Sequence, residues 1–334
     1  MLSNKKKVYI VLVNYNGWKD TIECLESVFK LSHKNFQIIV VDNSPTDDSI
    51  NQIEAWALGK AHKNIVTAHK KLVYPLEPKP LRFRTISQKE SERNFYEDQL
   101  LIIKAENNKG FSAGNNIALK YALKRNDFDY CWILNNDTVV EKDSLTKQIL
   151  FFKENIKRKT GILGSKLVNY SNPKEIQAVG GVFSSITYTS KHIGSGLPVS
   201  TQKRNLKSID YAVGASMFLS KNFLVEIGLM NETYFLYYEE IDWAFRAKKK
   251  NWYIDWCEDS LVYHKEGASI GSSMKGLKKS NNSDVSSFKS RKIFFNTLQQ
   301  NKTMFWISSI LMIINRLRRL QLKTAVSFCR ILIK

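Results

Sequence analysis

The sequence predicts an α/β fold with a mostly parallel central sheet and flanking helices. Over residues 8–140, short apolar runs alternate with segments whose apolar residues recur at helical spacing, which is typical of strand–helix–strand units. Three polar clusters, at 14–16, 42–48 and 135–137, each follow an apolar run. Because the carboxyl ends of parallel strands share one edge of the sheet, where such folds bind ligands, these clusters predict a nucleotide-type site.

The elements are expected in chain order. Apolar runs predict strands at 8–13, 36–41, 100–104 and 129–137. A first helix is expected over 21–31, and a second follows Asp47 and Asp48, whose charges suit a helix N-terminus. A third helix opens at Gly110 and runs through Leu123. These segments supply both the sheet and its covering layers.

Two segments interrupt this order. Residues 69–99 begin with three prolines in close succession and continue as a mixed charged stretch, so we expect a partly disordered surface excursion. Residues 265–290 are rich in Ser, Lys, Asn and Gly, which is typical of a mobile lid or a linker. The expected division is therefore a domain over 1–264 with an insertion at 69–99, a flexible lid or linker over 265–290, and a basic amphipathic helical region over 291–334.

Composition narrows the class of protein. The 334 residues are 43% hydrophobic, enough for a proper core, and carry a net charge of +20. Residues 265–334 hold 14 Lys or Arg against two acids, so the excess is concentrated near the C-terminus. No nucleic-acid module is recognisable, and an anionic membrane surface or a phosphate-bearing substrate fits this charge better. The oligomeric state stays open, a homo-oligomer included.

The cysteines and the N-terminus give two further expectations. Four widely spaced cysteines without a Cys-x-x-Cys pair suggest buried free thiols in a reducing compartment. Lys5–Lys7 precede an apolar stretch that resembles a signal peptide, but this stretch is short, meets Asn14 and lacks a small-residue cleavage site. We expect a first strand there, and no apolar run reaches the roughly 18 residues that span a bilayer.

The first candidate site lies at Asn135-Asn136-Asp137, directly after a buried strand. A carboxylate beside two amides suits Mg or Mn held beside a diphosphate, whose oxygens complete the coordination. Taken alone, a polar turn is the simpler interpretation. Asp42 also follows a buried strand, where it can accept a hydrogen bond from a pyrimidine N3–H or a ribose hydroxyl. The alternative for Asp42 is ordinary turn chemistry in Asp-Asn-Ser-Pro.

Residues 110–116 place small side chains and backbone amides at a helix start, which favours phosphate contact. Neither a Walker loop nor a Gly-x-Gly-x-x-Gly fingerprint is present. Later in the chain, Glu239, Glu240 and Asp242 open another helix. We expect Asp242 to pair with Arg246, while a glutamate in the first turn serves either the helix dipole or general-base catalysis.

Two further features leave alternatives open. His264 ends an apolar run and is either a structural histidine or a metal ligand beside Asp137. Residues 304–314 are too short to cross a membrane as a helix. Beyond them, basic residues form a narrow stripe beside an apolar face on a helical wheel over 316–334. Such a helix either lies in a membrane interface or packs on its own domain or a partner.

Together these motifs resemble the inverting glycosyltransferases of family 2 with the GT-A fold, most of all bacterial rhamnosyltransferases that build lipid-linked surface glycans. The resemblance covers roughly residues 8–300, apart from 69–99. It rests on Val11-Leu-Val-Asn14-Tyr-Asn16-Gly, Val40-Val-Asp42-Asn-Ser, Asn108-Lys-Gly110-Phe-Ser-Ala-Gly114-Asn-Asn116, Leu134-Asn-Asn-Asp137, Val213-Gly214-Ala, Tyr238-Glu-Glu240-Ile-Asp242-Trp and Val262-Tyr-His264.

The resemblance implies roles for individual residues. Asp42 would hold the nucleobase, Asn135 and Asp137 would stand for the Asp-x-Asp metal motif, Glu240 would be the base, and His264 would contact metal or diphosphate. Asn135 in place of the first acid leaves one carboxylate for the metal, and a Glu stands where an Asp is common for the base. The full expected sets are Val13, Asn14, Asp42, Asn43, Gly110, Asn116, Asn135 and Asn136 for the nucleotide-sugar, Gly214, Glu239 and Trp243 for the sugar and acceptor, and Asp137, His264 and more weakly Asn135 for the metal.

The resulting hypothesis is a metal-assisted hexosyltransferase with a GT-A (nucleotide-diphospho-sugar transferase) fold. It would transfer L-rhamnose from dTDP-L-rhamnose, with inversion, to a lipid-linked acceptor in cell-envelope polysaccharide synthesis. The expected location is the inner face of the cell membrane, as a peripheral protein, with no nucleic-acid partner. A UDP-sugar donor (galactofuranosyl or N-acetylhexosaminyl transfer) is the alternative within the class. A catalytically silent nucleotide-binding protein at the membrane is the alternative outside it.

Overall fold

A computed structural model describes residues 6–44, 48–265 and 281–333. Its main sheet has the strand order β3-β4-β2-β1-β5-β11-β7-β12-β6, with β8 paired to β7. The strands are β1 (Val8–Asn14), β2 (Phe36–Asp42), β3 (Phe83–Ser87), β4 (Leu100–Lys104), β5 (Tyr130–Leu134), β6 (Thr138–Val140), β7 (Thr160–Asn169), β8 (Ile176–Ala178), β11 (Ser216–Ser220) and β12 (Tyr253–His264). The expected α/β fold with a mostly parallel sheet is confirmed.

Parallel and antiparallel pairs divide this sheet. The five N-terminal strands, from β3 to β5, pair in parallel, and β12 pairs in parallel with β7. The strand β11 is antiparallel to both of its neighbours, and β12 is antiparallel to β6. In the parallel part, Asn14, Asp42 and Lys104 end their strands in register, so their side chains share the carboxyl edge.

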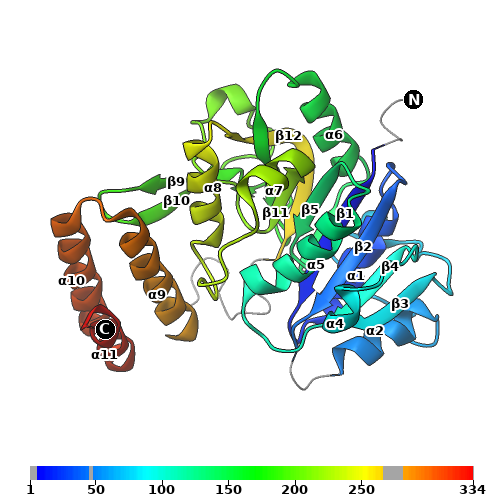
Figure 1. The fold of residues 1–334 in the computed structure, drawn as a ribbon, viewed down its shortest axis with the longest axis horizontal. Helices are drawn as coiled ribbons and strands as arrows, with labels where there is room; N and C mark the ends of the chain where they lie inside the picture. The colour runs from blue at the N-terminus through cyan, green and yellow to red at the C-terminus, as the bar shows by residue number, and fades with distance from the viewer. Residues whose placement is uncertain (1–5, 45–47, 266–280, 334) are drawn as a thin grey trace.

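Helices cover both faces of the sheet (Figure 1). One face packs against α1 (Trp18–Phe29), α2 (Ser49–Ala57) and α6 (Ser144–Glu154), and the other against α5 (Phe111–Arg125), α7 (Lys221–Ile227) and α8 (Glu239–Lys249). Strand residues alternate between the two cores, with Tyr9 and Val11 on one side and Val8 and Ile10 on the other. The sheet is thus buried on both faces, which explains its nearly continuous apolar runs.

The C-terminal helices form a separate group beside the hairpin of β9 (Gly180–Ser184) and β10 (Thr189–Ile193) (Figure 1). They are α9 (Asn281–Leu298), α10 (Lys302–Arg318) and α11 (Leu322–Ile333). Phe295 stacks on Phe305 and Phe288 on Phe328, with ring centroids 3.8 and 3.9 Å apart. Within the described part of the chain, no helix combines the length and apolarity that a membrane span requires.

Three expectations about local structure need correction. Residues 69–99 contain α3 (Lys70–Val73), β3 and α4 (Gln88–Ser91), and β3 extends the sheet as an edge strand, so partial disorder was wrong. Buried Glu26 holds this segment by accepting hydrogen bonds from the Glu77 amide and the Lys79 amine, 2.7 and 3.0 Å away. These long-range contacts, invisible in a proline-rich sequence, explain its order.

The second and third corrections concern the C-terminal region. The expected linker over 265–290 contains the first turns of α9, while residues 266–280 lie outside the described range. The wheel drawn over 316–334 assumed one helix, but Leu320 adopts φ 55° between α10 and α11. Arg316, near the end of α10, pairs with Asp284 at 2.9 Å rather than facing outward in a basic stripe.

Candidate active site

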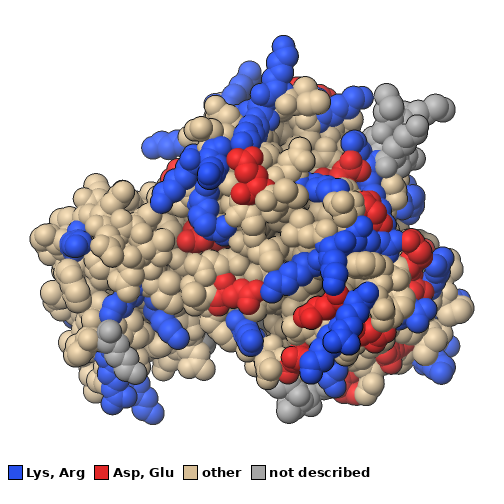
Figure 2. Space-filling model, in the orientation of Figure 1, with Lys and Arg blue, Asp and Glu red and all other residues tan. Residues whose placement is uncertain are grey.

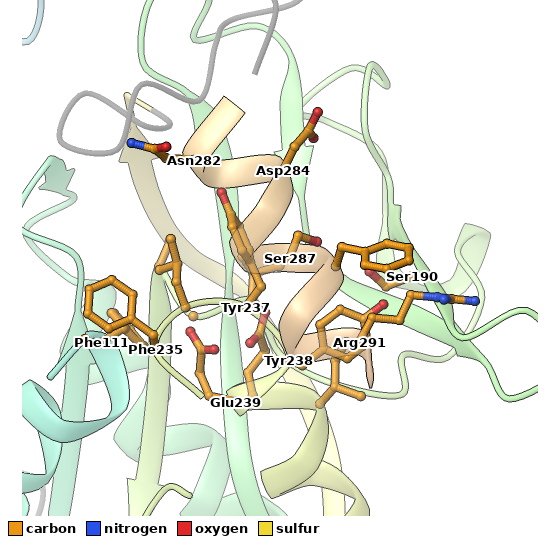
Figure 3. A pocket seen from close by; sticks show the side chains of 18 of the residues that line it. Phe111, Ser190, Phe235, Tyr237, Tyr238, Glu239, Asn282, Asp284, Ser287 and Arg291 are labelled. Carbon is orange, nitrogen blue, oxygen red and sulfur yellow. The ribbon is translucent and has the colours of Figure 1, made fainter. Parts of the chain in front are cut away.

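A cavity of about 980 Å³ opens at the carboxyl edge of the sheet and extends to the C-terminal helices. Chain segments far apart in the sequence meet on its wall (Figure 3). The predicted site residues that line it are Val13, Asn43, Gly110, Asn135, Asn136, Asp137, Gly214, Glu239, Glu240 and His264. The convergence of these residues on one cavity makes it the candidate active site.

Asp137 and His264 form the most distinctive pair on this wall. The Oδ1 atom of Asp137 lies 3.2 Å from Nε2 of His264, and both side chains are buried. His264 Nδ1 lies 2.7 Å from Oε1 of Gln177, while the Gln177 amide donates to the His264 carbonyl. Because the Gln177 oxygen must accept, Nδ1 carries a proton and Nε2 is left to face the carboxylate.

This pair fits a divalent cation. Asp137 Oδ1 is buried without a hydrogen-bond partner, and neighbouring ligands of an octahedral ion with bonds of about 2.1 Å lie about 3 Å apart. Burial raises the pKa of Asp137, but His264 and Lys265 lower it overall, so the group stays ionised. Among the described residues, no cluster of three His, Cys, Asp or Glu is found, so further ligands would be amide, water or substrate oxygens.

On the nucleotide side, Asn14 positions Asp42. The Asn14 amide donates to Oδ1 of Asp42 at 2.7 Å, and its own oxygen accepts from Thr21 at 2.8 Å. Asp42 opens into a smaller cavity of about 210 Å³ that Thr85 and Lys104 also line. Neither Thr85 nor Lys104 was predicted as a site residue. Thr85 lies in the segment that was expected to be partly disordered. Lys104 gave no signal besides its place at a strand end.

The Gly110 loop presses against the turn that precedes α8. Gly110 has φ +93°, and a Cβ atom there would lie 2.0 Å from the carbonyl oxygen of Phe235. The Phe111 amide donates to this same carbonyl at 2.9 Å. A side chain at position 110 would therefore push apart two walls of the cavity.

The turn before α8 is strained and presents two carboxyl groups. Tyr237 and Tyr238 have φ 69° and 72°, an uncommon conformation for large side chains that tends to occur at functional sites. Glu239 and Glu240 follow directly, and one carboxyl oxygen of each is buried without a hydrogen-bond partner. In Figure 3 the Glu239 side chain points toward the same space as Phe111 and Phe235.

Burial changes the protonation of this glutamate pair. It raises the pKa of Glu240, and it raises that of Glu239 further because an ionised Glu240 stands beside it. Glu239 therefore keeps its proton while Glu240 ionises, which suits a base beside a neutral neighbour. Asp242 pairs with Arg246 at 2.9 Å, which confirms the expected helical ion pair.

The helix α9 holds this turn from the other side. Ser290 donates to the Leu236 carbonyl at 2.8 Å, and the hydroxyls of Ser283 and Tyr237 are hydrogen-bonded. In Figure 3 the ring of Tyr237 runs alongside this helix. The C-terminal region therefore belongs to the candidate active site. The sequence did not predict this, because residues 265–290 were expected to form a lid or linker.

A family model named glycosyl transferase family 2 matches residues 9–72 and 82–203, more than half of the chain. The chain belongs to glycosyl transferase family 2. The gap in the match lies between α3 and β3, inside the segment expected to be an insertion. The GT-A fold expected from the resemblance agrees with the observed sheet and its helices.

Relatives of this family 2 chain are distant. The low-salt glycan biosynthesis hexosyltransferase Agl10 of Haloferax volcanii is 27% identical over 172 residues, which cover 51% of this chain and 53% of Agl10. An uncharacterized glycosyltransferase of Rickettsia conorii is 26% identical over 152 residues, 46% of this chain and 18% of that protein. This chain thus matches about half, or less, of the length of these relatives.

Two solved structures share the fold with this family 2 chain. GalNAc-T7 with UDP, GalNAc and Mn2+ aligns with a TM-score of 0.58 and 14% identity, over 90% of this chain and 50% of that one. The mannosyltransferase PcManGT of Pyrobaculum calidifontis, in complex with GDP-Man and Mn2+, aligns with a TM-score of 0.51 and 11% identity, over 97% and 74%. At this identity, the likeness extends to the GT-A fold.

Trp243 and Asn116 are predicted site residues of this family 2 chain that do not line the cavity. Trp243 is fully buried, and its indole donates to the Gly228 carbonyl at 3.0 Å, so its ring packs in the core rather than facing a sugar. Asn116 is buried on α5 and bonds to the Met230 backbone and to Glu232. Both lie one turn or so inside a helix, where the interior side of the helix faces the core.

Proposed function

We propose that this chain is an inverting hexosyltransferase that uses a nucleoside-diphosphate sugar and a divalent cation. The observation that carries the proposal is the arrangement of two pairs on one cavity: the carboxylate–imidazole pair of Asp137 with His264, and the two carboxyl groups of Glu239 and Glu240. The first pair suits a cation that neutralises a diphosphate, and the second suits a general base. Agl10, the relative named a hexosyltransferase, supports the hexosyl class.

The donor would occupy the nucleotide side of the cavity. Asp42, which is fixed by Asn14 and lines the smaller cavity, is proposed to bind the nucleobase, with Val13, Asn43 and Gly110 of the main cavity beside the ribose and diphosphate. We favour dTDP-L-rhamnose, on the motif resemblance, over a UDP-sugar such as a galactofuranose or N-acetylhexosamine donor. Because two fold relatives bind UDP and GDP-Man, the test below also includes UDP-sugar and GDP-sugar donors.

Asp137 and His264 are proposed to hold the cation, with Asn135 as a weaker ligand. A bound Mg or Mn would supply Lewis-acid stabilisation to the departing diphosphate. Fold relatives bound to Mn2+ support this choice. The side chains contribute the rest: Gln177 fixes the imidazole of His264, and burial of Asp137 excludes competing water.

The reaction would be a single displacement at the anomeric carbon. Glu240, ionised as the pH rises through about 7, takes the proton of the acceptor hydroxyl. The acceptor oxygen bonds to the anomeric carbon as the bond to the diphosphate breaks, and the configuration inverts. The nucleoside diphosphate leaves with the electron pair of the broken bond, and Glu240 retains the acceptor proton.

We also propose that α10 docks on an anionic membrane surface, where a lipid-linked glycan acceptor would be found. Its outer face exposes Trp306, Ile307, Ile310, Leu311, Ile314 and Leu317. Figure 2 shows this part of the surface as largely uncharged, with a few basic side chains and no acidic ones. Residues 285–334 contain ten Lys or Arg and no Asp or Glu, so a second copy would be repelled while anionic lipids would be attracted. The inner face of the cell membrane is the proposed location.

The test is release of nucleoside diphosphate from a donor panel with Mn or Mg. The panel contains dTDP-L-rhamnose, UDP-N-acetylglucosamine, UDP-galactofuranose and GDP-mannose. Turnover of one donor that requires the cation and is lost in Glu240→Gln supports the proposal. Nucleotide binding without turnover of any donor, with a membrane extract supplying acceptor, would favour a catalytically silent nucleotide-binding protein instead.

A further inference from the structure

We infer that the far end of the cavity, between α9, α10 and α11, binds the phosphate of an anionic amphiphile, and that Arg316 is its ligand. This inference rests on the proposed function for one point, that the amphiphile is the acceptor. The site itself is formed by residues of the three C-terminal helices. It gives the acceptor a definite path from the apolar surface to the glutamate pair.

The far end combines an apolar wall with one basic group. Phe288, Met312 and Phe328 form the wall, and Asn315 and Arg316 lie beside them. Among the described residues that line the cavity, the lysines and arginines are two arginines, Arg291 and Arg316. A wall of this kind accommodates an alkyl chain, and a guanidinium beside it suits the anionic group at the end of that chain.

The two arginines differ in how many of their guanidinium nitrogens already form hydrogen bonds. Arg291 is buried, and all three of its nitrogens donate to backbone carbonyls or hydroxyls, among them Tyr188 O at 3.1 Å and Ser309 Oγ at 2.7 Å. It therefore ties the helices to the β9–β10 hairpin. Arg316, in contrast, pairs with Asp284 through Nη2 at 2.9 Å, and its Nε is buried without a hydrogen-bond partner. Arg316 thus retains donor capacity for a phosphate.

The surroundings favour an anion that carries a chain. Asp284 is the acid nearest to the guanidinium, and residues 285–334 add no other. Met312 and Asn315 lie on α10, whose outer face is the exposed apolar surface. An amphiphile in that surface would reach Arg316 with its phosphate and direct its remaining part toward Glu239 and Glu240, which line the same cavity.

The experiment is titration of the full chain with dodecyl phosphate, followed by tryptophan fluorescence and calorimetry. Arg316→Gln should weaken binding by about tenfold or more, the expected loss for one charge-assisted contact. Asp284→Asn should leave binding unchanged or tighter, because it frees the guanidinium. Arg318→Gln, a change of an exposed basic residue two positions away on the same helix, should behave as the wild type.

Three outcomes would overturn the inference. Arg316→Gln could bind dodecyl phosphate as tightly as the wild type. Asp284→Asn could lose binding together with Arg316→Gln, which would make the ion pair structural. Inorganic phosphate could bind as tightly as dodecyl phosphate, with the same dependence on Arg316, which would make the ligand a free phosphate.

Titration with UDP and dTDP on the same variants separates this inference from the proposed function. Arg316→Gln should keep nucleotide binding, since Arg316 lies on α10 whereas Val13 lies on β1 and Asn43 directly after β2. A wild type that binds dodecyl phosphate through Arg316 but binds no nucleotide would refute the proposed function and retain the phosphate site.

Discussion

Asp137 and His264 face each other across 3.2 Å, although His264 ends β12 whereas Asp137 lies in the short connection between β5 and β6. The sheet brings them together because β6 and β12 pair antiparallel, with His264 opposite Thr138. A carboxylate oxygen and an imidazole nitrogen at this distance are held together by a cation or a proton between them. This relationship links the fold directly to the proposed chemistry.

The two neighbouring glutamates should respond differently to removal of their charge. Glu240→Gln removes the proposed base and should lower the transfer rate by about 10²-fold or more. Glu239→Gln resembles the protonated form that Glu239 already adopts, so most of the transfer rate should remain. Steady-state transfer with the preferred donor measures both variants. Equal losses in the two, or full activity in Glu240→Gln, would remove the base assignment from Glu240.

The pH dependence of stability should depend on Glu239. Burial and the adjacent Glu240 raise its pKa in the folded chain, so the folded state holds a proton that the unfolded state releases above about 4.5. Its contribution to stability is therefore complete below that pH and is lost as pH rises through the folded-state pKa. Glu239→Gln cannot ionise, so thermal unfolding should show a gain over the wild type that grows from pH 5 to 8.

A surface glutamate provides the comparison for this pH effect. The hydrogen bond from Lys159 lowers the pKa of Glu226, so Glu226→Gln should show no such gain as the pH rises. If the stability of the wild type and of Glu239→Gln changed in parallel with pH, Glu239 would not hold a proton in the folded chain.

Gly110→Ala should impair the site beyond its cost in backbone strain. Its Cβ would meet the Phe235 carbonyl at 2.0 Å and displace the turn before Glu239. Gly228→Ala is a matched control, because Gly228 has φ +80° and ψ −169°, close to the +93° and −171° of Gly110, but nothing within 4 Å of an added Cβ. Both should cost about 1–3 kcal/mol of stability from strain. Gly110→Ala alone should lower nucleotide binding and transfer, and equal activities in the two variants would contradict the contact.

The apolar face of α10 should be needed for membrane binding. Leu311→Asp places a charge on this face and should abolish co-sedimentation with vesicles containing phosphatidylglycerol. Val225→Asp is the control, because Val225 is at least as exposed but lies on α7. The wild type should bind neutral phosphatidylcholine vesicles more weakly. Retained binding in Leu311→Asp would place the membrane contact elsewhere.

Local patterns predicted the first strands of the sheet and part of the cavity wall. Apolar runs at 8–13, 36–41 and 100–104 became β1, β2 and β4 nearly to the residue, because these strands are buried on both faces. The polar residues at their ends, with Asp137 and His264, then converge at one edge. Strand-end positions follow from periodicity alone, so this part of the site was visible in the sequence.

The remaining features depend on long-range contacts. The charged stretch around β3 is ordered by pairing with β4 and by Glu26, neither of which is a local signal. The contact of α9 with Leu236 and Tyr237 lies in a Ser-rich segment that resembles a linker. The helical wheel over 316–334 did not allow for the break at Leu320, a left-handed residue that is neither Gly nor Asn. Pattern reasoning assigns such residues to the helix interior.

The most direct test of the account is thermal stabilisation by dTDP, UDP and GDP, each with and without Mn or Mg, in the wild type and in Asp137→Asn. A nucleotide at a hundred times its dissociation constant should stabilise the wild type by about 2.7 kcal/mol. We expect one nucleotide, dTDP in the favoured version, to stabilise the wild type only with the cation, and Asp137→Asn to lose this effect. Stabilisation by UDP would instead favour a UDP-sugar donor. No stabilisation by any nucleotide with either cation would contradict the proposed metal-assisted transferase.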